Sequence, residues 1–331
     1  MLETSIGPAA VEMTGSPAQP AHKIYTSGSK YPYVLVTPAR NEAKFIELTI
    51  KSVVAQTIRP TKWVIVNDGS TDGTDDIARR YASQYPWIEL IRTPERSDRH
   101  FAGKVDAFNA GYSRLNDVDY EIIGNLDADI SFDEEYLAFL VSKFAENPRL
   151  GVAGTPYREE RPEHDEQFKS PEHVSGACQM FRRKCFEEIG GYLPVRSGGI
   201  DLIALLSAQS KGWQTRRFDD KICFHHRSVG SGMDAGVYRR LLNLGRKDYL
   251  LGSHPVFEIF RSANRTRSRP YVTGGVLMLV GYLWALLRHV ERTMPEHLIE
   301  LRRRDQIQRL LSALRHPWKN RNAETASEDR R

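Results

Sequence analysis

Short apolar runs alternate with amphipathic stretches over the first half of the chain. The runs are Tyr33–Thr37, Trp63–Asn67, Ile88–Ile91 and Tyr120–Leu126. Between the first two, Ile46, Ile50, Val53 and Val54 fall at helical spacing. Strands that alternate with helices predict an α/β fold, a doubly wound and mostly parallel sheet with flanking helices. Asn41 is expected to cap the first of these helices.

The alternation weakens after about residue 150. We expect a strand over 151–155, a polar surface loop over 158–169 and a helix over 200–210. Phe224 and the His225-His226-Arg227 sequence end another short strand.

The C-terminal part has a different pattern. Residues 272–287 carry almost no charge, but the run is shorter than the ~20 residues that a simple transmembrane helix needs. Gly274, Gly275 and Gly281 also weaken it as a helix. We expect a membrane-associated or re-entrant segment; a buried helical hairpin or a dimer contact is the alternative. Residues 298–314 form a basic amphipathic helix of the kind that lies on anionic membranes.

These patterns divide the chain into four parts. We predict a flexible leader over 1–27, a catalytic domain over 28–255, a helical membrane-associating tail over 256–315 and disorder over 316–331.

Composition supports a globular protein: 40% of residues are hydrophobic and 27% are charged. The net charge of +5 suits an anionic partner, although each basic cluster has the alternative of being a solvated surface. The cysteines are Cys178, Cys185 and Cys223, and no Cys-x-x-Cys occurs, so neither a disulfide framework nor a zinc knuckle is indicated. A reducing compartment fits best.

Polar residues follow three of the predicted strands, over 38–42, 67–72 and 127–129. Ligands of doubly wound sheets bind beyond the carboxyl ends of the strands, so these positions predict a site. No Gly-x-Gly-x-x-Gly follows the first strand, which argues against a dinucleotide-binding domain, and no Walker A motif is present either.

Asp127 and Asp129 can both reach a hard divalent cation if the backbone turns between them. Such an ion can neutralise charge on a diphosphate leaving group. The alternative is an ordinary turn. Asp68 can accept a base or ribose hydrogen bond or close an Asx-turn. Lys104 could meet phosphate, although a lone lysine more often faces solvent.

Asp201 begins an apolar helix, where an acid is favoured by the helix dipole in any protein. Its functional alternative is a general base for an acceptor hydroxyl. His225 or His226 could complete a metal site with two aspartates, or the pair could be satisfied near the surface. Alternation sends the two side chains to opposite faces, so at most one is expected to be a ligand.

Taken together, these residues resemble the family 2 inverting glycosyltransferases of the GT-A fold, from about Tyr33 to Arg227. The resemblance rests on motifs in a specific order: Thr37-Pro38-Ala39-Arg40-Asn41-Glu42, Val66-Asn67-Asp68-Gly69-Ser70-Thr71-Asp72-Gly73-Thr74, Gly103-Lys104 with Asn109-Ala110-Gly111, Asn125-Leu126-Asp127-Ala128-Asp129, Gly176-Ala177 with Phe181-Arg182, Gly190-Gly191-Tyr192, and Ile200-Asp201.

The resemblance implies a role for each candidate. Four residues, Pro38, Ala39, Asn41 and Glu42, would line the nucleotide pocket. Asp68 would contact the base and Lys104 the donor. Asp127 and Asp129 would hold Mg²⁺ or Mn²⁺ on the diphosphate of a nucleotide-sugar donor. Apart from the resemblance, the chemistry of imidazole makes His225 our candidate for a third ligand. Asp201 would be the catalytic base of a single inverting displacement.

At two positions the sequence departs from the family motifs, and this narrows the kind of reaction that we expect. Ile200-Asp201 stands where the family often has Glu-Asp, and the Gln-x-x-Arg-Trp motif of processive synthases is missing. The chain thus resembles non-processive members that add one sugar in bacterial surface-polysaccharide assembly. We expect a lipid-linked or oligosaccharide acceptor, a peripheral place on the cytoplasmic face of the cell membrane, and no nucleic-acid partner. A polyprenyl-phosphate sugar synthase and a catalytically inactive nucleotide-binding scaffold remain as alternatives.

Overall fold

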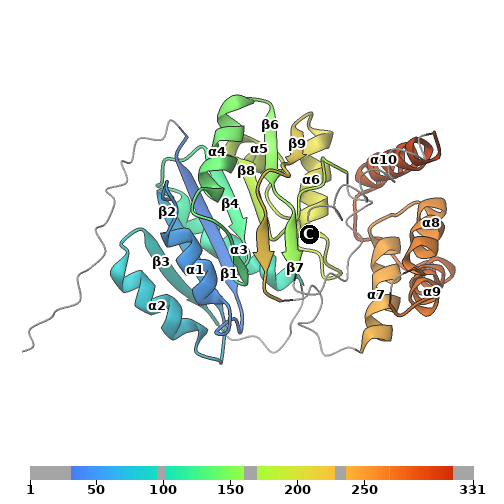
Figure 1. Ribbon diagram of the computed structural model, residues 1–331, viewed down its shortest axis with the longest axis horizontal. Helices are drawn as coiled ribbons and strands as arrows, with labels where there is room; N and C mark the ends of the chain where they lie inside the picture. Colours follow the sequence, from blue (N-terminus) through green and yellow to red (C-terminus); the bar gives the residue numbers. More distant parts are fainter. Residues whose placement is uncertain (1–30, 95–100, 160–169, 228–235, 268, 316–331) are drawn as a thin grey trace, which may run out of the picture.

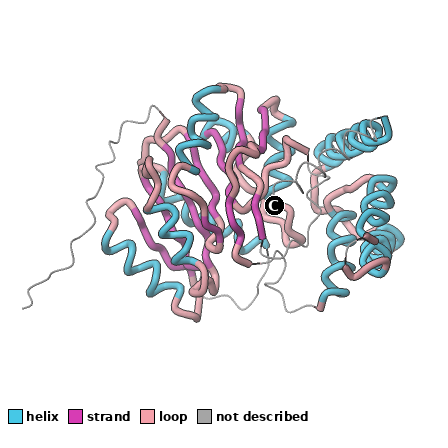
Figure 2. The backbone as a smooth tube through the Cα atoms, in the orientation of Figure 1, coloured by secondary structure: helices cyan, strands magenta, loops and turns pink. Residues whose placement is uncertain are grey.

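The computed structural model describes residues 31–94, 101–159, 170–227, 236–267 and 269–315 (Figure 2). The predicted leader over 1–27, the disorder over 316–331 and most of the polar loop over 158–169 lie outside these residues.

Seven strands of the described chain form the central sheet, in the order β3-β2-β1-β4-β8-β6-β9 (Figure 1). The first four pair in parallel, whereas β8 is antiparallel to both of its neighbours. The strands are β1 Tyr33–Ala39, β2 Lys62–Asp68, β3 Ile88–Thr93, β4 Ile122–Leu126, β6 Leu150–Gly154, β8 Cys178–Arg182 and β9 Gln214–Arg217. The expected parallel core is present, but the sheet as a whole is mixed.

Helices cover both faces of this sheet (Figure 1). One apolar cluster joins Val34 and Val64 to the face packed by α3, and another joins Leu35 and Ile65 to the opposite face. Successive strand residues point to opposite faces, so a strand buried on both sides must be apolar throughout. The flanking helices are α1 Ile46–Val54, α2 Thr74–Gln84, α3 Phe101–Tyr112 with the short 3-10 turn η1 Ser113–Leu115, α4 Tyr136–Glu146, α5 Arg183–Glu188 and α6 Ile200–Ser210.

A small second sheet lies beside the end of β4. It has the order β5-β10-β7, from Ile130–Ser131, Cys223–His225 and Tyr157–Glu159. In β5 and β10 the antiparallel register sets His225 opposite Ile130, next to Asp129 in the chain. This pairing therefore brings residues nearly a hundred positions apart to one place.

Four helices form the C-terminal part and lie at one end of the molecule, beyond α6 (Figure 1). They are α7 Val237–Leu250, α8 Pro255–Arg265, α9 Thr273–Leu287 and α10 Glu296–Arg315. Helix α7, within the range predicted for the catalytic domain, packs against α9. No described helix combines the length and apolar character needed to cross a membrane.

Glycines that weakened the helix prediction over 272–287 turn out to hold α9 against its neighbours. A Cβ on Gly281 would lie 2.1 Å from the Leu242 carbonyl oxygen, and one on Gly275 would lie 2.1 Å from that of Ser262. The low helix propensity of glycine is therefore outweighed by contacts that only a residue without a side chain allows.

Helix α10 binds back onto the protein. Leu298 and Ile299 are buried in the core cluster that contains Ile203 of α6. Arg302 donates a hydrogen bond to the Leu251 carbonyl (2.6 Å), and Arg303 donates one to that of Gly252 (3.0 Å). The sequence pattern predicted that this helix lies on a membrane, but these four side chains contact the protein itself.

Candidate active site

The loops after β1 and β2 are joined to each other by hydrogen bonds. The Asn41 backbone N–H donates to Ser70 Oγ (3.0 Å), and the Thr71 N–H donates to Asn41 Oδ1 (2.9 Å). Asn41 has a φ of 55°, in the left-handed region that asparagine tolerates better than most residues. The prediction that Asn41 caps a helix is wrong: α1 begins at Ile46, and the Asn41 side chain bridges two loops instead.

The next residue extends this junction. The Glu42 N–H donates to Thr74 Oγ1 (2.8 Å) at the start of α2, and the Glu42 side chain is buried. Pro38 and Ala39, the last residues of β1, lie directly before these loops. All four residues predicted for the nucleotide pocket thus stand at the carboxyl end of β1.

Asp68 ends β2 and is only 6% exposed. Its Oδ1 accepts a hydrogen bond from Thr93 Oγ1 at the end of β3 (2.9 Å), and Arg40 lies 3.9 Å from its other oxygen. A fixed carboxylate between two strand ends is placed to accept a hydrogen bond from a ligand at the sheet edge.

Asp127, Asp129 and His225 form one cluster, with a ligand atom from each lying within 4.8 Å of the others. Asp127 directly follows β4, and its N–H donates to the Ala177 carbonyl (2.9 Å). Between Asp129 Oδ1 and His225 Nε2 the distance is 3.5 Å. Octahedral Mg²⁺ places neighbouring ligand atoms about 2.9 Å apart and opposite ones about 4.2 Å apart, so small shifts suffice to bind one ion.

The hydrogen bonding of His225 fixes its orientation. Its Nδ1 donates to the carbonyl oxygen of Arg227, and a carbonyl can only accept, so Nδ1 carries the proton. A neutral His225 therefore presents the lone pair of Nε2 to the Asp129 carboxylate. A pair of acceptors in this position attracts a cation or a shared proton, and histidines anchored to a backbone carbonyl through the other ring nitrogen are usual metal ligands.

His226 lies outside this cluster. Its Nε2 shares a hydrogen bond with Ser131 Oγ (2.8 Å), and its ring stacks on that of Phe45. The two histidines thus have different partners, as expected for neighbouring residues at the end of a strand. Of the two candidates, the geometry supports His225.

Lys104 of α3 reaches the same cluster, with its Nζ 2.5 Å from Asp127 Oδ1. Burial opposes the Lys104 charge, but nearby carboxylates outweigh that cost, so the pKa of Lys104 is raised above its ordinary value. The carboxylates are those of Asp127, Asp201 and Asp129. Burial also raises the pKa of Asp127; Lys104 opposes this shift, and Asp129 adds to it.

Asp201 stands in the first turn of α6, after Gly199 in the left-handed conformation at the N-cap. Its carboxylate packs on Gly176, where a Cβ would lie 3.1 to 3.3 Å from the Asp201 side chain. Its charge also acts on Lys104. The structure thus brings the predicted base to the edge of the cluster of Asp127, Asp129 and His225, from an element far along the sequence.

Arg227 belongs to the site, although no role was predicted for it. Its guanidinium pairs with the Glu42 carboxylate, and its Nε lies 3.7 Å from Asp129 Oδ2. Arg227 therefore links the predicted nucleotide pocket to the cluster that contains Asp129. The only sequence signal was its position directly after the two histidines.

The charges of this cluster favour a bound cation. Asp127, Asp129 and Asp201 gather near one lysine, and Arg227 is shared with Glu42. Oxygen ligands with one imidazole suit Mg²⁺ or Mn²⁺. The residues present therefore fit the divalent ion that the sequence predicted.

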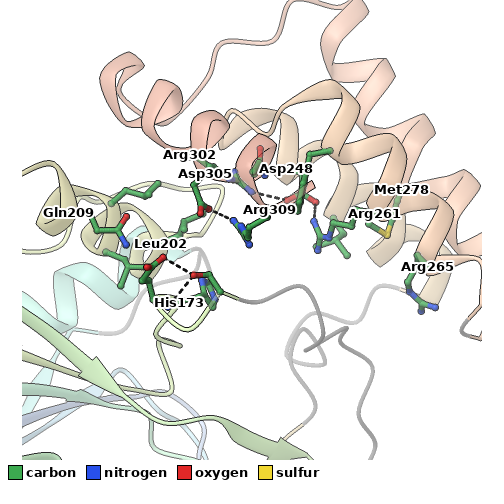
Figure 3. Close-up of a pocket in the computed structure, with 17 residues that line it drawn as sticks. His173, Leu202, Gln209, Asp248, Arg261, Arg265, Met278, Arg302, Asp305 and Arg309 are labelled. Atoms are coloured by element: carbon green, nitrogen blue, oxygen red, sulfur yellow. Dashed lines mark hydrogen bonds and ion pairs between the residues drawn. The ribbon is translucent and has the colours of Figure 1, made fainter. Parts of the chain in front are cut away.

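A separate cavity of about 260 Å³ lies between α6 and the C-terminal helices, and none of the predicted site residues lines it (Figure 3). Asp248 pairs there with Arg261 and Arg302, and Arg309 pairs with Asp305. These charged residues all belong to α7, α8 and α10, so their ion pairs hold the C-terminal helices to one another, and the cavity marks their junction with α6.

Glu258 is fully buried close to this junction. Burial, with Asp248 nearby, raises its pKa to about 8, although Arg261 and Arg302 oppose the shift.

Comparisons with known proteins agree with this fold. A poly-β-1,6-N-acetyl-D-glucosamine synthase of Staphylococcus epidermidis is 29% identical over 117 residues, which cover 35% of this chain and 26% of that protein. The chain thus matches about a quarter of that relative's length. A mannosyltransferase from Pyrobaculum calidifontis, solved with GDP-Man and Mn²⁺, has the same fold: the TM-score is 0.52 with 17% identity, over 87% of this chain and 88% of that one.

The match to a family model covers most of the central sheet and the clustered residues up to β8. Residues 34–184 match the model of glycosyl transferase family 2. The matched residues include Asp68, Lys104, Asp127 and Asp129. By this match, the part of the chain from residue 34 to residue 184 belongs to glycosyl transferase family 2, and its strands have the GT-A-like arrangement of that mannosyltransferase.

Proposed function

We propose that this glycosyltransferase moves one sugar from a nucleotide-diphosphate donor to a hydroxyl of a lipid-linked or oligosaccharide acceptor, with inversion at the anomeric carbon. The observation that carries the proposal is the cluster of Asp127, Asp129 and His225, with Lys104 and Asp201 at its edge. It combines a cation site, a phosphate-binding charge and a separate carboxylate, as the transfer requires.

The donor site would extend from the strand ends to the cluster. Asp68 would accept a hydrogen bond from the nucleoside, and the joined loops of Asn41 and Ser70 would line the pocket. Asp127, Asp129 and His225 would hold Mg²⁺ or Mn²⁺. When bound, the ion supplies positive charge that stabilises the departing diphosphate. Lys104 would add a second positive charge on that side.

Asp201 would take the proton of the acceptor hydroxyl as its oxygen attacks the anomeric carbon. The sugar–phosphate bond would break on the opposite face and release the nucleoside diphosphate. The carboxylate belongs to α6 rather than to the cation site, and it packs directly on Gly176, which fixes its position. A base held apart from the metal is free to accept a proton.

A thermal-shift screen tests donor binding first. Nucleoside diphosphates and their sugars are added to the full chain with Mn²⁺, because a ligand that binds only the folded state raises the melting temperature. We expect a shift that Asp129→Asn removes. Asp219→Asn is the control, since Asp219 is exposed and pairs with Arg217, away from the cluster. Equal shifts in all three proteins would overturn the metal assignment.

Transfer is tested with the donor found in this way. Asp201→Asn should keep the thermal shift and lose turnover, because a neutral amide cannot accept the proton. Retained turnover would remove Asp201 as the base. Transfer to polyprenyl monophosphate alone would instead support a polyprenyl-phosphate sugar synthase. The absence of both transfer and donor hydrolysis would support a catalytically inactive scaffold.

A further inference from the structure

The outward face of α9 is apolar and exposed to water. Its five large side chains are Val276, Val280, Leu283, Trp284 and Leu287, between 42% and 77% exposed, and we call them the α9 outer face. Their spacing places them on one side of the helix. The opposite side, with Met278 and Tyr282, is buried against the neighbouring helices.

An apolar helix face of this size needs a partner. Single exposed apolar residues are common in soluble proteins, but contiguous apolar surface marks an interaction site. Tyr271 and Val272, directly before α9, are also exposed, at 59% and 61%. On the adjacent helix α8, Val256 and Ile259 are more than half exposed. Exposed apolar side chains are therefore present on both α8 and α9 and in the residues directly before α9.

The exposed charges of helices α7 to α9 have one sign. Between residues 237 and 290 the only acidic residues are Asp248 and Glu258, and both are buried. The same segment has exposed arginines at both ends of α9 and on α7; they are Arg239, Arg246, Arg267, Arg269 and Arg288. The Arg246 guanidinium lies over the Trp284 ring, 5.3 Å from its centre. A partner with negative charge around an apolar interior matches this pattern.

We propose that the α9 outer face docks this protein onto the surface of an anionic lipid bilayer. An apolar helix face bordered by arginines lies in the headgroup region, with its apolar side chains in the acyl boundary. Trp284 suits that depth because indole is favoured at the membrane interface. The helix has 15 residues, so it lies on the membrane and does not cross it.

The proposal assigns the membrane contact to α9 and not to α10. The sequence pattern indicated both the apolar segment over 272–287 and the basic helix over 298–314, but in α10 Leu298 and Ile299 are buried against α6, and Arg302 and Arg303 bind backbone carbonyls. In this arrangement α10 connects the docking helices to the catalytic domain. The inference adds a partner to the proposed function and does not require that transfer takes place.

Vesicle co-sedimentation of the full chain tests this surface. The vesicles are phosphatidylcholine alone, or phosphatidylcholine mixed with the anionic phosphatidylglycerol, whose negative surface potential attracts basic side chains. We expect binding to the anionic vesicles that falls as salt rises. The double variant Leu283→Gln with Leu287→Gln should bind at least tenfold more weakly. Glutamine is a good helix former, and both positions are exposed, so the fold should persist.

Two controls make the result specific. Leu48→Gln changes a leucine of similar exposure (41%) on α1, in the catalytic domain, and should bind like the unchanged protein. Arg288→Gln should weaken binding to the anionic vesicles and reduce its salt dependence, while melting temperature and circular dichroism stay unchanged.

Three outcomes would overturn the proposal. Equal vesicle binding by the double variant would place the membrane contact elsewhere, including the residues beyond 315. Equal binding to neutral and anionic vesicles would remove the role of the arginines. A stable dimer in light scattering that the double variant makes monomeric, without vesicle binding, would identify the α9 outer face as a contact between two copies.

Discussion

Replacing Gly245 by alanine tests the packing that holds α9 in place. A Cβ on Gly245 of α7 would lie 1.8 Å from the Met278 carbonyl oxygen and 3.0 Å from the Tyr282 backbone nitrogen. Ordinary contact begins near 3.4 Å, so the two helices would have to separate by about 1.6 Å. Both obstructing atoms belong to the backbone, so no side chain can rotate to relieve the clash.

The cost follows from this geometry. Overpacking in a closed interface costs about 1–3 kcal/mol, and immobile backbone atoms favour the upper end. The higher helix propensity of alanine offsets about 1 kcal/mol of this cost. We therefore expect the α7–α9 packing to lose about 2 kcal/mol, which corresponds to about a 30-fold larger population of the opened state.

Hydrogen exchange measured by mass spectrometry gives the readout. In Gly245→Ala, amides of α9 should exchange about 30-fold faster, whereas those of β1 should keep their protection. Gly236→Ala is the matched control, because no atom lies within 4 Å of a Cβ at Gly236 and its φ is −52°. If α9 exchanged at the original rate or more slowly in Gly245→Ala, the close helix contact would be refuted.

Three further predictions concern the site and its junction with the C-terminal helices. His225→Ala should weaken Mn²⁺ binding, measured by titration calorimetry, by at least about tenfold, whereas His226→Ala should not; equal losses would contradict the choice of ligand. Gly176→Ala should displace the Asp201 carboxylate by a few tenths of an ångström and lower kcat by about tenfold with an unchanged donor KM. An unaltered kcat would show that Asp201 does not need this support. Glu258 has a pKa of about 8 when folded and an ordinary one when unfolded, so folding takes up a proton between these values, and stability falls as pH rises through that range. Glu258→Gln should remove this part of the pH dependence, seen as a melting-temperature advantage that grows from pH 5 to pH 8; a constant difference would contradict the assignment.

The sequence was most informative where local pattern and packing agree. The helix Ile200–Ser210 has the predicted bounds, and the buried runs at Val34 and Val64 form neighbouring parallel strands. Apolar runs buried on both faces leave little choice of structure. The same reasoning located Asp127 and Asp129 at a strand end.

The sequence pattern could not predict which distant strands pair. The partners of Arg227 depend on the pairing of β10 with β5, which joins distant segments, and no local pattern specifies that register. The α9 helix shows the other limit. Propensity counts Gly281 against a helix, yet the approach of the Leu242 carbonyl requires a glycine there, and that contact exists only in the folded chain.

The hydrogen bonds between the loops after β1 and β2 have a consequence for how this site can change over time. Asn41 contacts both Ser70 and Thr71, and the Ala43 N–H donates to Asp72 Oδ2 (3.0 Å). A substitution in one loop leaves a polar group of the other without its bond, so the effects of two changes are not additive. We expect these loops to evolve as one unit, in which a change on either side is tolerated only after a matching change on the other.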